Sequence, residues 1–329
     1  MVETNWFQEK SVLITGGTGM IGAALTELLQ ARRAKVRVAS LDRDPVLAPG
    51  VKFRQLDLTK WEACVEACDG MDYVFHLAGI KGGAGIGRSQ GARFLEGNAF
   101  INLHMLKAAR ECGVKRYLFT STIGVYPDGE IFREQDVWAR PPHPSDWYGA
   151  WAKRFGELQC EASLEQYGFE SVIVRPANVY GPCDNFNPKT AMAVGALIAR
   201  VFEGENPLVV WGDGTPVRDF IYARDCARGM MLAMEYAKPC DPVNLGSGVG
   251  VTIRELVETI CKHTPRPPKL EWDTSRPKGT PVRIMDITKA REMLGFEPQY
   301  SLDQGIRETM EWYGSHREHQ ARRYNIFTD

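Results

Sequence analysis

Residues 11–22 read Ser11-Val12-Leu13-Ile14-Thr15-Gly16-Gly17-Thr18-Gly19-Met20-Ile21-Gly22. The apolar and β-branched run at the start of this stretch predicts a short buried strand. The glycines that follow satisfy the spacing G-x-G-x-x-G, and a helical pattern begins at about Ile21. Glycine lets the backbone turn sharply and come close to a pyrophosphate, which the free N–H groups of the helix start can bind. The stretch therefore predicts a dinucleotide-binding site.

Strand-like and helix-like segments alternate along the first half of the chain. The predicted strands cover residues 36–39, 73–77, 117–120 and 171–174, and the predicted helices cover 61–68, 98–112 and 148–167. Such alternation implies βαβ units, whose right-handed crossovers give a doubly wound parallel sheet with helices on both faces. We therefore predict an α/β fold of the Rossmann type.

The pattern changes after Pro176, where Pro and Gly become frequent. Helical stretches at residues 192–202, 253–263 and 303–313 are separated by loops, and the Pro- and Lys-rich segment 266–278 is expected to be an extended loop. We expect a dinucleotide-binding domain over residues 1–176, completed by about 217–248. A smaller, mainly helical C-terminal substrate lobe would cover residues 177–216 and 249–329.

Composition limits the class of partner. The formal net charge of the 329 residues is −1, so no overall basic field favours nucleic acid or a membrane surface. No apolar run is long enough to span a bilayer, and the first ten residues lack the apolar core of a signal peptide. Eight cysteines are scattered without the spacing of secreted proteins, and Cys64 and Cys68 are interpreted as buried thiols. We expect a cytoplasmic protein without a metal site.

The specificity for NAD or NADP depends on the end of the second predicted strand. An acidic residue about twenty positions after the glycines binds the adenosine ribose of NAD. Asp42 therefore favours NAD, whereas the neighbouring Arg43 favours the 2′-phosphate of NADP. The cofactor is predicted to be NAD or NADP, with a slight preference for NADP. Asp57 and Leu58, after the third strand, are expected to meet the adenine.

Further motifs follow one another in a fixed order. They are residues 16–22, Asp57-Leu58, His76-Leu77-Ala78-Gly79, Thr120-Ser121-Thr122, Tyr148 with Lys153, residues 175–182 and Arg218-Asp219-Phe220. With this order the chain resembles the extended short-chain dehydrogenases/reductases, and within them the NAD-dependent epimerase/dehydratase family of nucleotide-sugar enzymes. Residues 181–187 and 273–283 are similar to the GDP-L-fucose synthases in particular.

The resemblance implies which residues bind the cofactor. They lie in the glycine turn, at the ends of the following strands and at the start of the predicted helix 148–167: Gly16, Gly19, Met20, Ile21, Gly22, Asp42, Arg43, Asp57, Leu58, Leu77, Ala78, Gly79, Tyr148, Lys153 and Pro176.

The resemblance also implies a catalytic set of Thr122, Tyr148 and Lys153. Thr122 would hydrogen-bond the substrate oxygen, and Tyr148 would be the acid/base at the carbon that loses or gains hydride. A tyrosine with a pKa near ~10 needs a neighbouring cation to act near neutrality. Lys153 and the positively charged nicotinamide would supply that field.

The spacing of this pair departs from the family pattern Tyr-x-x-x-Lys, because Tyr148 and Lys153 are five residues apart. On a regular helix with about 100° per residue, such side chains point ~140° apart. Either Tyr148 lies just before the regular helix, or a π-bulge absorbs the extra residue. Otherwise Tyr148 packs at the helix entry, with reduced or altered activity.

Three positions narrow the reaction that the resemblance implies. Ile123 and Gly124 stand where sugar 4,6-dehydratases carry an Asp-Glu pair, so dehydration is not expected. Gly124 and Cys183 stand where GDP-L-fucose synthases carry the Cys and His that epimerise carbons 3 and 5. What remains is hydride transfer at carbon 4 by a 4-keto reductase or 4-epimerase, with a GDP-sugar favoured. The alternatives are a 4-dehydrogenase and a non-catalytic dinucleotide-binding sensor or scaffold.

Basic and amide side chains are expected to hold a nucleotide-diphosphate sugar. Arg218 and Arg283 would pair with the diphosphate, a task that suits a planar guanidinium, and this pair argues against a reductase of small ketones. Asn178 would reach the sugar or the diphosphate. Lys81 and Arg88 would contact the hexose from a glycine-rich loop. By analogy with relatives, the helices at 98–112 and 148–167 would form a homodimer.

Overall fold

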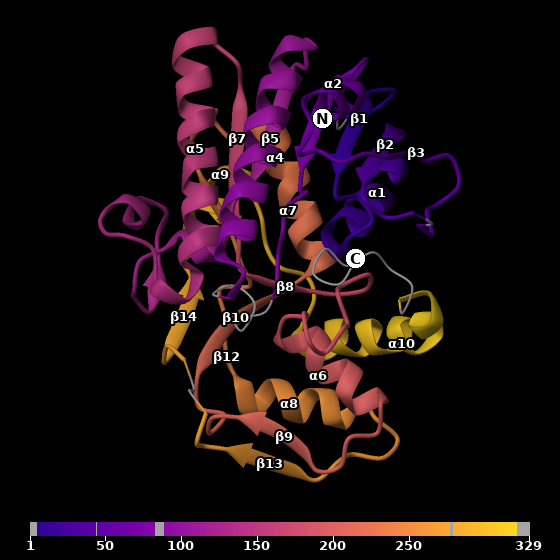
Figure 1. The fold of residues 1–329 in the computed structure, drawn as a ribbon, viewed down its shortest axis with the longest axis vertical. Helices are drawn as coiled ribbons and strands as arrows, with labels where there is room; N and C mark the ends of the chain where they lie inside the picture. Colours follow the sequence, from indigo (N-terminus) through magenta and orange to yellow (C-terminus); the bar gives the residue numbers. More distant parts are fainter. Residues whose placement is uncertain (1–4, 44, 83–88, 277–278, 321–329) are drawn as a thin grey trace.

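A parallel sheet of seven strands forms the upper part of the molecule in Figure 1. The computed structural model describes residues 5–43, 45–82, 89–276 and 279–320. From edge to edge the strands are β11(Val243–Leu245), β7(Ser171–Pro176), β5(Arg116–Thr120), β4(Tyr73–His76), β1(Ser11–Thr15), β2(Lys35–Ser40) and β3(Lys52–Gln55). The order reverses beside β1, which is the switch point of a doubly wound sheet.

Helices cover both faces of this sheet. One face carries α1(Met20–Ala31), α7(Ala223–Tyr236) and α9(Thr288–Leu294), and the other carries α2(Trp61–Cys68), α4(Gly91–Glu111) and α5(Trp147–Tyr167). Alternation within β1 supplies both cores: Val12 and Ile14 pack with α1 and α7, whereas Leu13 packs with α2 and α4. The predicted Rossmann-type fold is confirmed.

The smaller lobe lies below the sheet in Figure 1. Its helices α6(Ala193–Phe202), α8(Ile253–Lys262) and α10(Leu302–Gln320) share a third hydrophobic core with β9(Leu208–Trp211) and β13(Leu270–Asp273). The prediction of an extended loop over residues 266–278 was wrong for residues 270–273, because β13 pairs in parallel with β9.

A second sheet connects the two parts. It contains β6(Ile131–Phe132), β8(Asn178–Tyr180), β10(Val217–Tyr222), β12(Gly250–Thr252) and β14(Val282–Met285), with β10 between β12 and β14. Three short 3₁₀ turns, η1(Ile123–Val125), η2(Glu134–Trp138) and η3(Pro144–Asp146), lie between β5 and α5. The segment 217–248 therefore contributes to both sheets, through β10 and β11.

Two further sequence predictions concern buried thiols and membrane spans. Cys64 and Cys68 are buried as predicted, and burial raises the pKa of the Cys64 thiol to about 12. Among the helices in the described ranges, none combines the length and apolar character needed to cross a membrane.

Candidate active site

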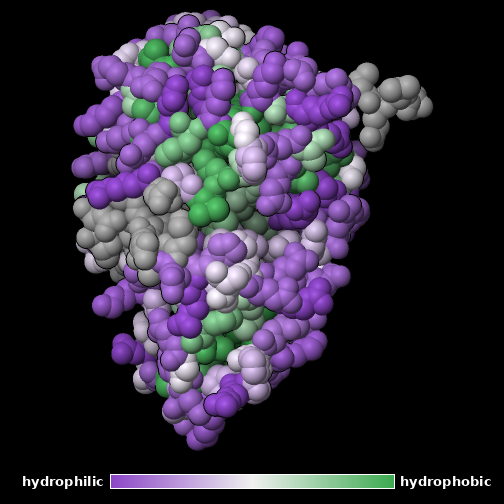
Figure 2. Space-filling view, turned by 90° about the vertical axis from the view of Figure 1, so that its right-hand side faces the viewer, coloured by the Kyte–Doolittle hydropathy of each residue, from purple (hydrophilic) through white to green (hydrophobic). Residues whose placement is uncertain are grey.

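A cavity of about 1600 Å³ lies between the ends of the sheet strands and the lobe. Figure 2 shows a hollow with apolar side chains at this level of the molecule. Almost all of the predicted site residues line it: Gly16, Gly19, Met20, Ile21, Gly22, Asp42, Asp57, Leu58, Leu77, Ala78, Gly79, Lys81, Thr122, Tyr148, Lys153, Pro176, Asn178, Arg218 and Arg283. Arg43 is exposed outside the lining, and Arg88 lies outside the described residues.

The glycine turn leaves room for a ligand at the start of α1. Gly16 has a φ of +67°, and a Cβ there would lie 3.0 Å from the backbone of Ala78. A Cβ on Gly22 would lie 2.4 Å from the Cα of Gly17. The first N–H groups of α1 have no partner within the helix, so the turn fits a pyrophosphate.

At the end of β2, hydrogen bonds fix the acidic residue in the cavity wall. Thr18 Oγ1 donates to Ser40 Oγ over 3.0 Å, and Ser40 Oγ donates to Asp42 Oδ2 over 3.2 Å. The backbone N–H of Asp42 donates back to Ser40 Oγ over 2.9 Å. The carboxylate of Asp42 is thus held where an adenosine ribose would enter.

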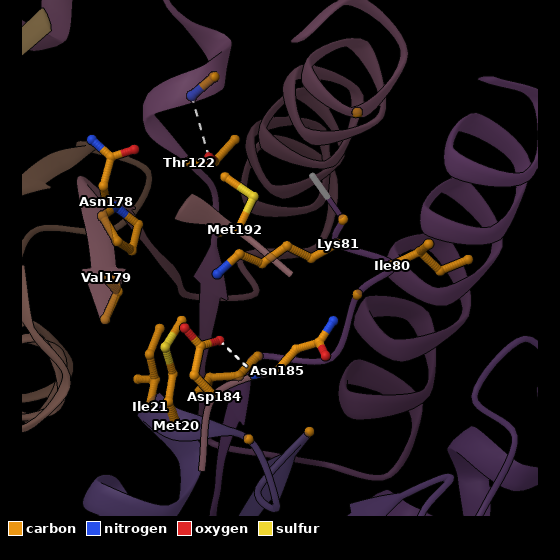
Figure 3. A pocket seen from close by; sticks show the side chains of 18 of the residues that line it. Met20, Ile21, Ile80, Lys81, Thr122, Asn178, Val179, Asp184, Asn185 and Met192 are labelled. Atoms are coloured by element: carbon orange, nitrogen blue, oxygen red, sulfur yellow. Dashed lines mark hydrogen bonds between the residues drawn. The ribbon is translucent and has the colours of Figure 1, made fainter. Parts of the chain in front are cut away.

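Thr122 lies where β5 ends and the turn η1 begins. Its Oγ1 accepts a hydrogen bond from the N–H of Gly124 over 3.2 Å (Figure 3). The hydroxyl hydrogen is left to donate, so Thr122 has the capacity to hydrogen-bond a substrate oxygen.

Lys153 points from α5 toward the loop that follows β4. Its Nζ lies 5.0 Å from the centre of the Phe119 ring, and a Cβ on Gly79 would lie 3.6 Å from it. Burial lowers the pKa of Lys153 to about 8, against the opposing effects of Glu157 and Cys160. The ammonium therefore lies at the floor of the cavity, next to loop residues that line it.

Tyr148 lies in the first turn of α5, which is α-helical from Trp147 to Tyr167. The extra residue is therefore not absorbed by a π-bulge. The Tyr148 ring packs against the start of α4, because a Cβ on Gly91 would lie 2.4 Å from its Cε2. Gly149 occupies the position four residues before Lys153, where the family pattern has the tyrosine. A Cβ added at Gly149 would meet no atom within 4 Å. Tyr148 and Lys153 thus line one cavity, but the groups that act on the charge of Lys153 are Glu157 and Cys160, not this phenol.

The two predicted arginines are brought together by strand register. β10 and β14 are parallel neighbours, and Arg218 pairs directly with Arg283 although 65 positions separate them in the numbering. Arg218 donates to the carbonyls of Val217 and Thr280 over 2.7 and 2.8 Å. Burial, and then the charge of Arg283, lower the pKa of Arg218. Two adjacent guanidinium groups at one cavity wall have the donors and the charge to bind an anionic group.

Asn178 and Lys81 reach the same space from opposite elements. Asn178 Nδ2 donates to the carbonyl of Asp219 over 2.8 Å, which leaves its amide oxygen toward the cavity side of β8. In the view of Figure 3, the side chain of Lys81 extends between Met192 and Asp184. Lys81 therefore adds a positive charge inside the cavity.

The sequence reasoning missed a polar group on η3. Arg283 Nη1 donates to Asp146 Oδ2 over 2.9 Å, and Ser145 Oγ donates to the same oxygen over 3.2 Å. His143 Nδ1 lies 2.7 Å from Ser145 Oγ. A Cβ on Gly124 would lie 3.3 Å from the Cβ of Asp146, so this glycine makes room for the carboxylate. In the sequence this group is visible only as the polar residues His143, Ser145 and Asp146 shortly before Tyr148, a pattern that an ordinary helix start also shows.

Within the described part of the chain, no group of three or more His, Cys, Asp or Glu side chains could hold a metal ion.

Comparison with known proteins agrees with this geometry. The model of the NAD dependent epimerase/dehydratase family matches residues 12–246. The probable GDP-L-fucose synthase 1 of Oryza sativa subsp. japonica is 33% identical, over 92% of this chain and 91% of the relative. The dTDP-4-dehydro-6-deoxy-D-allose reductase of Streptomyces bikiniensis is 30% identical, over 93% of this chain and 97% of the relative. The UDP-glucose 4-epimerase of Thermotoga maritima, solved with UDP-glucose, is 29% identical with a TM-score of 0.80, over 93% of this chain and 99% of that one.

The chain has a glycine turn that fits a dinucleotide and a lysine at the cavity floor, and the family model matches most of the sheet domain. These observations define its class as a nicotinamide-dependent enzyme. More particularly, the chain belongs to the NAD-dependent epimerase/dehydratase family. Its cofactor is accordingly NAD or NADP.

Proposed function

We propose that this enzyme transfers hydride at carbon 4 of a nucleotide-diphosphate sugar, as a 4-keto reductase or a 4-epimerase. The observation that carries the proposal is a single cavity that runs from the glycine turn, past Thr122 and Lys153, to the paired Arg218 and Arg283. A nicotinamide dinucleotide would occupy the first part and a diphosphate the last. The hexose would then lie between them, over Thr122.

The chain's own residues would bind and orient the cofactor. The N–H groups at the start of α1 would bind the pyrophosphate, and Lys153 would donate to the nicotinamide ribose. When bound, the nicotinamide supplies or accepts the hydride. The position of Asp42 in the cavity wall, with Arg43 outside it, supports NAD over NADP, since a 2′-phosphate would meet a carboxylate. This geometry outweighs the slight preference for NADP drawn from the sequence.

Proton transfer at the carbon 4 oxygen is assigned to Thr122 and Tyr148. Thr122 would hold that oxygen through its hydroxyl hydrogen. Tyr148, of which 39% is exposed, would turn from its contact with Gly91 toward the substrate. The cationic Lys153 and nicotinamide would then stabilise negative charge that develops on the phenolic oxygen as the proton is transferred.

The substrate side would recognise the nucleotide sugar through its diphosphate. Arg218 and Arg283 would bind the phosphates, and Asn178 and Lys81 would contact the sugar. Several curated relatives are named GDP-L-fucose synthase, which supports a GDP-sugar as the substrate. The lobe formed by residues 177–216 and 249–329 would enclose the nucleotide. A 4-dehydrogenase is the alternative reaction for the same residues.

The test is thermal stabilisation by NADH and by GDP, UDP, dTDP and CDP, each added alone. A nucleotide at 100 times its Kd stabilises the folded state by about 2.7 kcal/mol, so a base-specific shift identifies the substrate class. Arg283→Met should lose the nucleotide shift and keep the NADH shift. The absence of any nucleotide shift beside a normal NADH shift would refute the sugar proposal. Sugars linked to the nucleotide that gives the shift are then tested as substrates. Net consumption of NADH identifies a reductase, whereas conversion of the sugar without net change in NADH identifies an epimerase.

We also propose a homodimer through α4 and α5. These helices pack side by side and expose a group of large apolar side chains on their outer surface: Phe100, Leu103, Trp151, Phe155 and Leu158. Monomeric proteins rarely expose large contiguous apolar patches, and a twofold axis would bury this one against its copy.

A further inference from the structure

A buried chain of hydrogen bonds links the strand before the glycine turn to the helix that carries Lys153. Thr15 Oγ1 lies 2.8 Å from His76 Nδ1, and His76 Nε2 lies 3.2 Å from Asn102 Oδ1. Asn102 Nδ2 donates to the carbonyl of Ala152 over 3.3 Å. Thr15, His76 and Asn102 are each at most 1% exposed. The chain therefore crosses β1, β4 and α4 and ends on α5, one residue before Lys153.

The partners of Thr15 indicate which group donates and which accepts in each bond of this chain. Thr15 Oγ1 accepts from the N–H of Ala78 over 3.1 Å and, over 3.2 Å, from the N–H of Leu77, which it shares with the backbone carbonyl of Thr15. Its hydroxyl hydrogen must then go to His76 Nδ1, which places the ring proton on Nε2 and directs it to Asn102 Oδ1. Only the neutral imidazole satisfies this pattern. Burial, and then the charge of Lys153, lower the pKa of His76 to about 3, in keeping with a permanently neutral ring.

Both ends of the chain meet the cofactor part of the cavity. Leu77 and Ala78, which donate to Thr15, line that part, and the Ala78 backbone is what a Cβ on Gly16 would strike. At the other end of the same loop, Asn98 binds Ile80 through both backbone groups, over 2.9 and 3.1 Å. The Nζ of Lys153 lies over Gly79, between these two anchors.

We propose that His76 is a positioning residue, which acts through Thr15 and Asn102 to hold the loop 77–80 in register with the Lys153 turn of α5. The nicotinamide dinucleotide binds with full affinity only when this chain is intact. His76 does not line the cavity, and its two ring nitrogens contact Thr15 and Asn102. The proposal depends on cofactor binding alone and not on the identity of the sugar.

The two nitrogens of His76 can be tested separately. His76→Asn retains an acceptor at the place of Nδ1 and loses the bond to Asn102, whereas His76→Gln retains a donor at the place of Nε2 and loses the bond from Thr15. We expect each variant to bind NADH about fivefold more weakly, as measured by fluorescence titration, since each loses one buried hydrogen bond. Thermal unfolding of each variant is recorded in parallel to confirm that it is folded.

Thr15 offers a matched pair if the His76 variants do not fold. Thr15→Ser keeps the hydroxyl and should bind NADH within about twofold of the wild type. Thr15→Val keeps the shape but cannot accept from Leu77 and Ala78, and should weaken NADH binding about fivefold or more. If Thr15→Val binds NADH like the wild type while its melting temperature falls, the chain is only structural and the proposal is overturned. In the wild type, by contrast, NADH binding without binding of GDP, UDP, dTDP or CDP would count against the proposed function and leave this proposal standing.

Discussion

Lys153 shows how burial tunes a single charged residue. Its ammonium lies against a phenylalanine ring and a glycine loop, with Glu157 and Cys160 as the neighbours that favour the charged form. Glu157 is itself fully buried and bound to Arg175 over 2.6 Å, and it accepts from Ser121 over 2.5 Å. Because Arg175 and Ser121 already compensate this carboxylate, desolvation dominates and the pKa of Lys153 falls to about 8.

This lowered pKa predicts a pH-dependent cost to folding. Below about pH 8 the folded protein holds Lys153 as a desolvated ammonium. Between pH 8 and about 10.5 this lysine is protonated in the unfolded chain but not in the folded one, so the stability of the folded state rises with pH. Lys153→Met removes the cost, and its stability relative to the wild type should decline as the pH is raised from 7 to 10. Urea unfolding at both pH values measures this difference. The exposed Lys52→Met serves as a control and should show no such trend; a trend of equal size in both variants would contradict the prediction.

The helix α5 contains both Tyr148 and Lys153, whose spacing is one residue longer than in the family pattern. Its two glycines in the first three turns face different surroundings. Gly149 has open space where a Cβ would be, whereas a Cβ on Gly156 would lie 2.3 Å from Cζ of the buried Phe119. The helix thus packs tightly on β5 at its middle and is open at its first turn.

Alanine at these two positions should change stability in opposite directions. Gly149→Ala should raise the free energy of unfolding by about 0.5 kcal/mol or more through helix propensity. Gly156→Ala should lower it by about 1–3 kcal/mol, because Phe119 must leave its place. Chemical denaturation of both variants checks the signs. Destabilisation by Gly149→Ala would mean that its side of the helix is filled in solution, and the open first turn would have to be revised.

At the scale of the whole molecule, the two proposals above depend on two different surfaces. One is the cavity between sheet and lobe, and the other is the group of exposed apolar side chains on α4 and α5, two helices that lie side by side in Figure 1. Since Tyr148 and Lys153 lie on α5, pairing of this helix with a second copy would also stiffen the catalytic wall.

Disruption of the apolar surface should therefore separate the subunits. Phe155, 46% exposed, lies between Trp151 and Leu158 on α5, and Phe155→Glu would place a charge from each subunit in the apolar interface. We expect a dimer for the wild type and a monomer for the variant in sedimentation velocity. Val249→Glu, at a 60% exposed apolar position elsewhere, is the control and should remain dimeric. A monomeric wild type would disprove the dimer proposal.

The sequence by itself determined five strands of the seven-stranded sheet, β1, β2, β4, β5 and β7, because each reads as a short apolar run with a turn or helix signal beside it. The bounds of the edge strands β3(Lys52–Gln55) and β11(Val243–Leu245) were not predicted. The glycine turn, the arginines and the lysine could be assigned from local motifs, and helix α2 was predicted at its observed bounds, Trp61–Cys68. Strands β9, β10, β13 and β14 were not predicted. They lie in the Pro- and Gly-rich second half, where strand and helix patterns do not alternate, and β9 pairs with β13 and β10 with β14 across long stretches of sequence. The same holds for Asp146 and for the Thr15–His76–Asn102 chain: a hydrogen bond depends on positions in space that no local spacing encodes. Tertiary structure also decided the direction of the Tyr148 side chain. One residue more or less on a helix rotates a side chain by about 100°, and the sequence does not show that the Tyr148 ring packs against Gly91.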